Sequence, residues 1–345
     1  MSKALRNFLI IAAILLIIGG IIAAVGTLLG GMRSITLTRE GIVINEIGNG
    51  RLVEVSEKYN KVTEVRIRAD LGDFILEEGD YFALKGRYNA SILKLDVSEK
   101  SGVLTIECRS INKTIFGWNL GSLDGEDNRL TLTYPRGTKF TNVDVTLNLG
   151  GLHISNFEAD SLIASLDAGS LFGNSITVGR LDAKMNLGDC KVDDLTILKT
   201  AVFNLDAGSF KGKSITAENL EARISLGSCT IDDLTVSKGA EFRLSAGSLY
   251  LRNASVYNLQ ASNNLGGIDY WGVLKGNAEF TLDAGALKLN LDNAETDLSY
   301  RIKTDLGSVS INGRSQGSSV NSSVVSPECT LEINTSLGSV AVTTR

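Results

Sequence analysis

The chain has 345 residues and a formal net charge of −5, and its 43% hydrophobic and 21% charged residues are typical of a folded domain with a sizeable core. The acidic balance, without a local lysine and arginine cluster, argues against nucleic acid as a partner. Four cysteines without C-x-x-C spacing are too sparse for a disulfide-stapled fold.

The N-terminus contains an uncharged apolar run from Phe8 to Leu29, which as a helix is about 33 Å long and spans a bilayer. Two basic residues precede the run and Arg33 is the next charge, so the positive-inside rule places residues 1–7 in the cytoplasm. We expect an uncleaved transmembrane anchor over residues 8–31, with the rest of the chain outside. A cleaved signal peptide is the less favoured alternative, because its apolar region would be shorter.

Residues 34–140 contain strand patterns of irregular spacing. The stretch YFALKGRYNASILKLDVSEKSGVLTIECRS predicts hairpin strands, because apolar and polar residues alternate between turn signals. One segment, RIRADLGDFILEE around Gly72, is an isolated early copy of the repeat that follows. We expect this region to form an irregular β cap, since an open stack of strands needs a protected end.

Residues 141–345 carry a repeat of about 20 residues that is marked by one glycine per copy. These glycines are Gly150, Gly169, Gly188, Gly208, Gly227, Gly247, Gly266, Gly285, Gly307 and Gly338. Around each of them apolar and polar residues alternate with a period of two, which is strand geometry and excludes helical repeats. The predicted fold is all-β, a β-solenoid resembling a single-stranded β-helix. Residues 313–327, rich in serine and glycine, are expected to form a loop before Gly338.

Positions counted from each glycine predict which side chains face the core. The residue two after it is apolar in every copy, so Cys190 and Cys229 are expected in the core, with a mutual disulfide or a metal site as less favoured alternatives. The residues five and one before it compensate in size, as in Ala183 with Leu187, so both positions are expected inside. The glycine itself is expected at a bend that a side chain would obstruct.

Two coil lengths fit the repeat, namely one copy of about 19.5 residues or two copies of about 39. The outward position two before the glycine includes Asp167, Asn186 and Asp206 in successive copies. A long coil stacks Asp167 directly on Asp206, whereas a short coil places Asn186 between them. Avoidance of like charges favours the short coil, with the long coil left as an alternative.

The first candidate contact residues are two acidic pairs, Asp193–Asp194 and Asp232–Asp233. Adjacent copies would place these four carboxylates on one side of the solenoid. A solvated turn face is the favoured interpretation and a weak cation site the alternative, since no calcium-loop pattern is present. His153, the single histidine, is expected on the solvated surface, and no metal or cofactor site is predicted.

The segment GGIDYWGVL, residues 266–274, departs from the repeat. Tyr270 is expected inside and Trp271 outside, where an exposed tryptophan could contact a sugar or a protein partner; packing of Trp271 under a loop is the favoured alternative. The chain ends in LEINTSLGSVAVTTR, which has only polar residues after its last apolar strand. This pattern predicts weak capping, so self-association at an open end is a further alternative.

The sequence also resembles a known family. The segments LTIECRS and LTLTYPRGTKFTNVDVTLNLGGLHIS, with the serial copies built on LG or AG, are similar to the bacterial adhesin-like family of toast-rack domains, a domain family of unknown function, over about residues 40–345. The resemblance implies a membrane-anchored cell-envelope protein, either an adhesin or a component of membrane-stress signalling. It implies no catalytic residues.

Together these expectations describe a single-pass, extracytoplasmic binding or sensing module of the bacterial envelope without catalysis. Its expected partners are the membrane, through the N-terminal helix, and an envelope glycan, lipid or protein. A self-assembling structural protein is the second interpretation. A polysaccharide-active β-helix enzyme is the third, because no exposed cluster of catalytic residue types stands out in the sequence.

Overall fold

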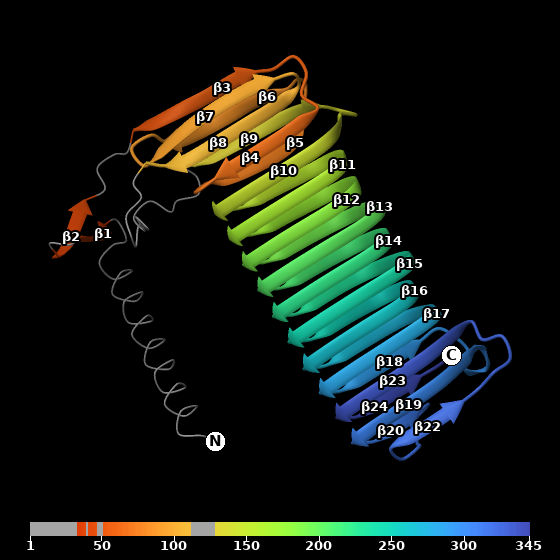
Figure 1. Cartoon of the computed structure of the whole chain (residues 1–345). Helices are drawn as coiled ribbons and strands as arrows, with labels where there is room; N and C mark the ends of the chain where they lie inside the picture. Colours follow the sequence, from red (N-terminus) through yellow and green to blue (C-terminus); the bar gives the residue numbers. More distant parts are fainter. Residues whose placement is uncertain (1–32, 39–40, 47–50, 112–127) are drawn as a thin grey trace.

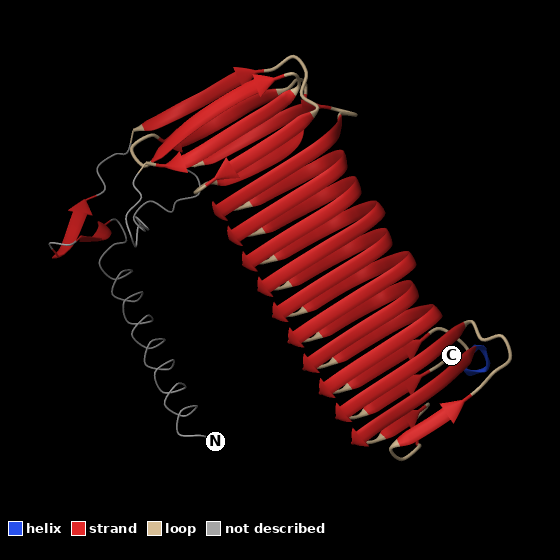
Figure 2. Cartoon of the chain, viewed as in Figure 1, coloured by secondary structure: helices blue, strands red, loops and turns tan. Residues whose placement is uncertain are grey.

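The computed structural model describes residues 33–38, 41–46, 51–111 and 128–345. These residues form strands and one short 3₁₀ helix, η2 (Glu295–Asp297), so the predicted all-β fold is confirmed (Figure 2). Within the described ranges no helix has the length and apolar character needed to cross a membrane. The anchor predicted for residues 8–31 lies outside them.

Long strands stack side by side along the centre of the molecule (Figure 1). They are β11 (Leu152–Ala168), β12 (Leu171–Leu187), β13 (Cys190–Ala207), β14 (Phe210–Leu226), β15 (Cys229–Ala246), β16 (Leu249–Leu265) and β17 (Ile268–Ala284). Each pairs in parallel with the next one copy along the chain, so that Leu171 pairs with Cys190 and Cys190 with Phe210. One repeat is therefore one coil, which confirms the short coil and excludes the long one.

Each coil bends within its long strand, as β12 illustrates. Its pairing with β13 is continuous over residues 171–174, 176–178 and 180–185, with breaks at Ser175 and Gly179. Ser175 has a φ of 52°, the left-handed conformation in which the chain changes direction. Each coil thus wraps three strand segments around one core, with side chains alternating between core and solvent along each segment.

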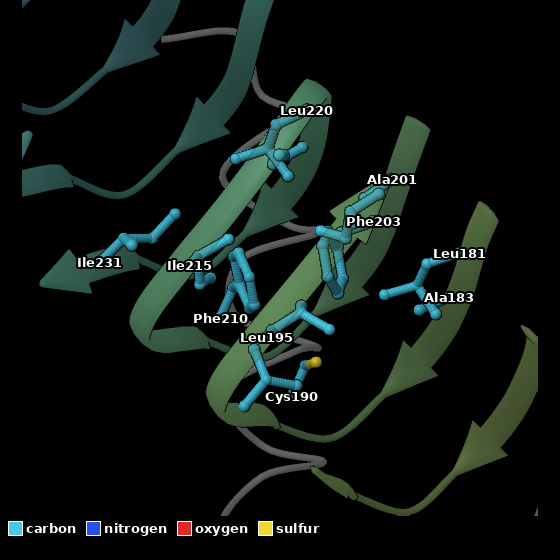
Figure 3. Close-up of a cluster of buried hydrophobic side chains, with 14 of the residues drawn as sticks. Leu181, Ala183, Cys190, Leu195, Ala201, Phe203, Phe210, Ile215, Leu220 and Ile231 are labelled. Atoms are coloured by element: carbon cyan, nitrogen blue, oxygen red, sulfur yellow. The ribbon is translucent and has the colours of Figure 1, made fainter. Parts of the chain in front are cut away.

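The inward residues of successive coils form one continuous hydrophobic core (Figure 3). In the row five before the glycine, alanine and phenylalanine alternate between coils from Ala183 to Phe280, as where Ala183 pairs with Phe203. Each phenylalanine ring occupies core volume that the small alanine side chains of the neighbouring coils leave free. Phe203 also stacks on Phe210, with ring centroids 4.3 Å apart. Cys190 and Cys229 are fully buried with free thiols, which confirms them as core residues.

The repeat glycines form a line of close backbone contacts along the stack. Gly208 has a φ of 145°, and a Cβ built on it would lie 1.8 Å from the carbonyl oxygen of Gly188 in the neighbouring coil. A side chain cannot occupy that space, and the backbone conformation is one that only glycine adopts readily. The predicted bend, obstructed by any side chain, is confirmed.

The prediction that the residue before the glycine faces the core is wrong. Leu187 is 60% exposed and Asn186 is exposed as well, because the chain turns outward at the corner before it reaches Gly188. The inward alternation stops at Met185, three residues before the glycine, and restarts at Cys190. The alternation of leucine and alanine at the position of Leu187 is therefore a feature of the surface and not of core packing.

The N-terminal end of the stack contains strands that lie out of chain order. They are β3 (Leu52–Lys58), β4 (Glu64–Ala69), β5 (Asp73–Gly79), β6 (Ala83–Asn89), β7 (Leu93–Lys100), β8 (Val103–Ser110), β9 (Arg129–Pro135) and β10 (Lys139–Leu149). The copy around Gly72 is not isolated, because β4 and β5 pair in parallel with β10 and β11 on one side and with β8 and β9 on the other. Strands β3, β6 and β7 add antiparallel pairings to this end. A further hairpin consists of β1 (Arg33–Thr38) and β2 (Gly41–Glu46).

The C-terminal end also departs from chain order. Its strands are β18 (Leu287–Leu291), β19 (Leu298–Leu306), β20 (Val309–Ile311), β21 (Arg314–Ser315), β22 (Ser319–Ser322), β23 (Cys329–Leu337) and β24 (Val340–Thr343). The last two strands of the chain, β23 and β24, insert between β17–β18 and β19–β20. The terminal coil is thus β19–β20, and β21 and β22 pair antiparallel with it.

Two expectations about this end are therefore corrected. The segment 313–327 is more than a loop, because it supplies β21 and β22 and so partners the edge of the terminal coil. The weak capping predicted from the final residues is wrong, since those residues lie inside the stack. An unpartnered parallel edge exposes hydrogen-bonding groups that recruit other chains, and β21 and β22 cover part of that edge here by pairing with β20 and β19.

Candidate functional site

The two acidic pairs lie at and beside one bend of the coil. Asp194 and Asp233 have φ values of 54° and 59°, in the left-handed region that aspartate and asparagine tolerate better than most residues. The Asp194 carboxylate accepts a hydrogen bond from Ser175 Oγ at 3.1 Å, and Asp233 accepts one from Asn253 Nδ2 at 2.5 Å. These two aspartates therefore bond the corresponding bends of neighbouring coils together.

Asp193 and Asp232 belong to a row of alternating charge. Lys213 pairs with Asp193 on one side and with Asp232 on the other, and Arg252 follows in the next coil. Arg252 Nε lies 2.6 Å from Asp232 Oδ1, an ion pair that is partly exposed. The two acidic pairs are thus two coils apart. Asp193 and Asp232 have the cationic partners Lys191 and Arg252, and the described residues contain no group of three or more metal-binding side chains. The expectation that adjacent coils gather the four carboxylates is wrong, because a coil bearing Lys213 lies between.

Trp271 lies on the outer face of β17, as expected, and is 49% exposed. Its Nε1 donates a hydrogen bond to Asp269 Oδ1 at 2.7 Å, which orients the indole ring. Tyr270 points into the core, where its hydroxyl donates to the Val273 carbonyl oxygen at 2.7 Å. Gly272 then brings the backbone so close to the carbonyl of Ala254 that no Cβ would fit. Trp271 is therefore held on a rigid strand rather than under a loop.

Neighbouring coils surround Trp271 with polar and aromatic side chains, and we call this set the Trp271 face. Its members are Asp269 and Trp271, their register partners Tyr250, Lys288 and Asn290, and Arg252, which follows Leu251 where the pairing of β16 with β17 is interrupted. Within it Trp271 pairs with Asn290, and Asp269 lies between Tyr250 and Lys288. Tyr250 is 43% exposed, so two aromatic rings reach solvent on adjacent coils. An aromatic ring beside hydrogen-bonding carboxylate, amide and cationic groups is suited to a ligand with both C–H and hydroxyl surfaces.

The other members of the Trp271 face were not singled out from the sequence, although the coil length identifies them. Tyr250 precedes Asp269 by 19 residues and Asn290 follows Trp271 by 19, so each pairs with that residue from the adjacent coil. The 19-residue spacing predicts these neighbours once one repeat is known to be one coil. The sequence favoured that length and left a coil of two repeats as the alternative.

His153 is half-buried rather than fully solvated. Its ring stacks on Phe172 with centroids 4.8 Å apart and an interplanar angle of 20°. Burial lowers the pKa of His153, the nearby Asp73 carboxylate opposes that effect, and Arg129 adds to it. The neutral imidazole is thereby favoured, and its role is to pack against Phe172.

The chain matches several solved bacterial proteins at low sequence identity and low TM-score. A putative lipid binding protein from Parabacteroides distasonis is 14% identical, with 86% of this chain and 98% of that chain covered and a TM-score of 0.35. A putative adhesin from Bacteroides fragilis is 12% identical, with 84% and 96% covered and a TM-score of 0.32. A putative cell adhesion protein from Clostridium sporogenes is 11% identical, with 86% and 100% covered and a TM-score of 0.20.

No curated protein matches the chain. The family model Toastrack DUF4097 matches residues 62–343, from just before β4 to the end of β24, the last strand of the chain. This chain therefore belongs to the Toastrack DUF4097 family.

Proposed function

We propose that this protein is a non-catalytic binding module of the bacterial cell envelope, an adhesin-type rod that is anchored by residues 8–31 and displayed outside the cytoplasm. The observation that carries the proposal is the Trp271 face, where two exposed aromatic rings lie among charged and amide side chains. The ligand class that fits this chemistry is an envelope glycan. An indole ring packs against the C–H face of a sugar, while Asp269, Arg252 and Asn290 can exchange hydrogen bonds with its hydroxyl groups.

The rigidity of the scaffold supports the same proposal. The residues of the Trp271 face come from three neighbouring strands of one packed sheet, and Asp269 already orients the indole. A preorganised surface loses little side-chain freedom when a ligand binds, so a modest number of contacts gives useful affinity. The stack also carries the face well away from the strands that close the N-terminal end (Figure 1).

The test uses the full-length chain in detergent micelles, titrated with soluble fragments of bacterial cell-wall glycan and followed by calorimetry. We expect Trp271→Ala to weaken glycan binding at least tenfold, which corresponds to about 1.4 kcal/mol. The matched control is Phe172→Ala, which removes an exposed aromatic ring from another part of the rod. Equal affinity of Trp271→Ala and the parent chain would contradict the proposed site, and cleavage of the bound glycan would contradict the non-catalytic role.

A further inference from the structure

A row of leucine and alanine residues runs along one edge of the solenoid. Each residue in the row ends its strand, and the strand tips form a line in Figure 1. In stacking order the row reads Ala168, Leu187, Ala207, Leu226, Ala246, Leu265, Ala284 and Leu337. We call these eight positions the leucine–alanine ladder. No contact described so far uses it.

The leucines of the ladder face solvent. Leu187, Leu226 and Leu265 are 60%, 61% and 60% exposed, and Leu337 is 51% exposed. Coils lie about 4.8 Å apart, so the leucines recur every ~9.6 Å and each alanine leaves a notch between two of them. Isolated exposed leucines are ordinary on protein surfaces, whereas a continuous apolar row is typical of an interaction site.

The centre of the ladder is flanked by small uncharged residues. The positions two before and one after the glycines of the two central coils are all serine: Ser225, Ser228, Ser245 and Ser248. Removing this part of the edge from water therefore desolvates no ionised group at those positions. The cost of burying it is low compared with that of a charged edge.

We propose that the leucine–alanine ladder binds the same ladder of a second copy of this chain, in antiparallel orientation about a twofold axis between Leu226 and Ala246. A row of even length that alternates large and small residues is complementary to its own reverse. Leu226 then faces Ala246 of the second copy, and Leu187 faces Ala284. Every leucine fills the notch at an alanine, as close packing of two surfaces requires.

The same axis keeps the aspartates of the edge away from one another. It places the row two before the glycines against the same row of the second copy. Asp206 then faces Asn264, Asp283 faces Asn186 and Asp167 faces Ser336, so each carboxylate meets an amide or a hydroxyl that can donate a hydrogen bond. In a parallel twofold pair, each leucine would meet the identical leucine and each alanine the identical alanine. Shape thus favours the antiparallel pair, and the charges of the edge are compatible with it.

The length of the ladder sets the strength of the pairing. Eight positions span about 34 Å, and the strip is only one corner wide, so the area that the two copies bury is below the ~1,000 Å² lower limit of stable specific interfaces. The alternation ends at Leu337, because Leu306 follows it with a second leucine, whereas Leu149 continues the alternation before Ala168. The proposed axis therefore leaves Leu149 opposite Leu306 at each end of the pair. We therefore expect a weak, reversible pair. If the rod is anchored as proposed above, an antiparallel pair places the two anchors at opposite ends and joins two membranes.

Cysteine crosslinking tests the pairing directly on the full-length chain in detergent micelles, where either orientation is free to form. Leu187 and Ala284 lie five coils apart in one chain, about 24 Å, which is too far for an intramolecular disulfide. The native cysteines are buried and leave a low background. Under mild oxidation, an equimolar mixture of Leu187→Cys and Ala284→Cys chains should give a disulfide-linked dimer, and Leu187→Cys alone should stay monomeric. A dimer from Leu187→Cys alone would show parallel pairing and overturn the proposal, as would the absence of a dimer from the mixture.

A second variant separates this inference from the glycan-binding proposal. Leu226→Glu should raise the dissociation constant of self-association at least tenfold in analytical ultracentrifugation. Leu198→Glu, at a 51% exposed leucine on another face, should leave that constant unchanged. Both substitutions are at the surface, so both variants should melt like the parent chain. Glycan binding should survive in Leu226→Glu, because Trp271 lies elsewhere on the coil. Equal association of the two variants would overturn the ladder interface whatever the glycan result.

Discussion

The repeat glycines give the sharpest prediction about stability, which concerns Gly208→Ala. The added Cβ would lie 1.8 Å from the Gly188 carbonyl oxygen, so the two coils must separate locally by more than 1 Å, which is about the shortfall from normal contact. That movement disrupts the hydrogen bonds from Gly188 N to Ala207 O and from Cys190 N to Ser209 O, both 2.9 Å long. Two such bonds are worth about 1–3 kcal/mol, and a non-glycine residue at a φ of 145° costs about 1–3 kcal/mol more.

The expected destabilisation is therefore about 2–6 kcal/mol, a large part of the ~5–15 kcal/mol that holds a typical domain together. Urea unfolding of the full-length chain in detergent, followed by circular dichroism, measures it. The matched control is Gly239→Ala, because a Cβ there comes no closer than 3.7 Å to any neighbour and the backbone is not left-handed. The reasoning is refuted if Gly208→Ala unfolds within about 0.5 kcal/mol of Gly239→Ala with an unchanged denaturant slope.

Three further predictions concern charge, pH and the end of the stack. Asn186→Asp should melt lower than Asn186→Ser at low salt, because both lose the 2.8 Å bond to Asp167 and only the first adds like charge; equal melting temperatures would contradict the register. Burial raises the pKa of Cys108 to about 12, so its stabilising effect is complete below the unfolded thiol pKa near 8.5 and is lost as pH rises toward 12. Between pH 8.5 and 10.5, the free energy of unfolding measured in urea should fall by about 2 kcal/mol less in Cys108→Ala than in the parent chain. An equal fall in the two proteins would contradict this prediction. Val320→Pro should detach β22 from the terminal coil and cause concentration-dependent end-to-end association in light scattering, whereas Val325→Pro, outside that strand, should not. A monodisperse Val320→Pro chain would contradict the proposed role of β22 in protecting the edge of the terminal coil.

The coil length and the core rows could be predicted because they depend on local spacing. Cys190 follows its glycine by the same two residues as the apolar residues of the other copies, so its burial is fixed by parity within one strand segment. The separation of Asp167 from Asp206 by Asn186 reflects direct stacking of neighbouring coils, which is the shortest contact that an outward row makes. Such interactions leave a signature in the spacing of the sequence itself.

The exposure of Leu187 could not be predicted by the same parity, because a corner interrupts the alternation. Two consecutive residues face solvent there, and nothing in the residue type distinguishes an exposed leucine from a buried one. The order of the terminal coils could not be predicted for a related reason. Strands β23 and β24 pair with β17 and β18 across more than 40 residues, and local alternation does not encode which distant edge a strand joins.

The candidate site was predicted only in part. The break in the repeat identified Trp271 as outward, because its parity lies within one strand segment. Its neighbours Tyr250, Arg252 and Asn290 come from other coils and required the stacking register. The acidic pair at Asp232 was misplaced relative to its copy at Asp193, since the intervening coil and its lysine were not counted between them.

The central claim, that the solenoid is displayed outside the cytoplasm as a binding surface, is tested most directly by labelling in intact cells. Val325 is 94% exposed, while all four native cysteines are buried, so Val325→Cys provides a single reactive thiol. Intact cells that produce the full-length Val325→Cys chain are treated with a small, membrane-impermeant maleimide, with the parent chain as the control. The account predicts labelling of Val325→Cys without lysis and none of the parent chain; labelling that appears only after lysis would contradict it.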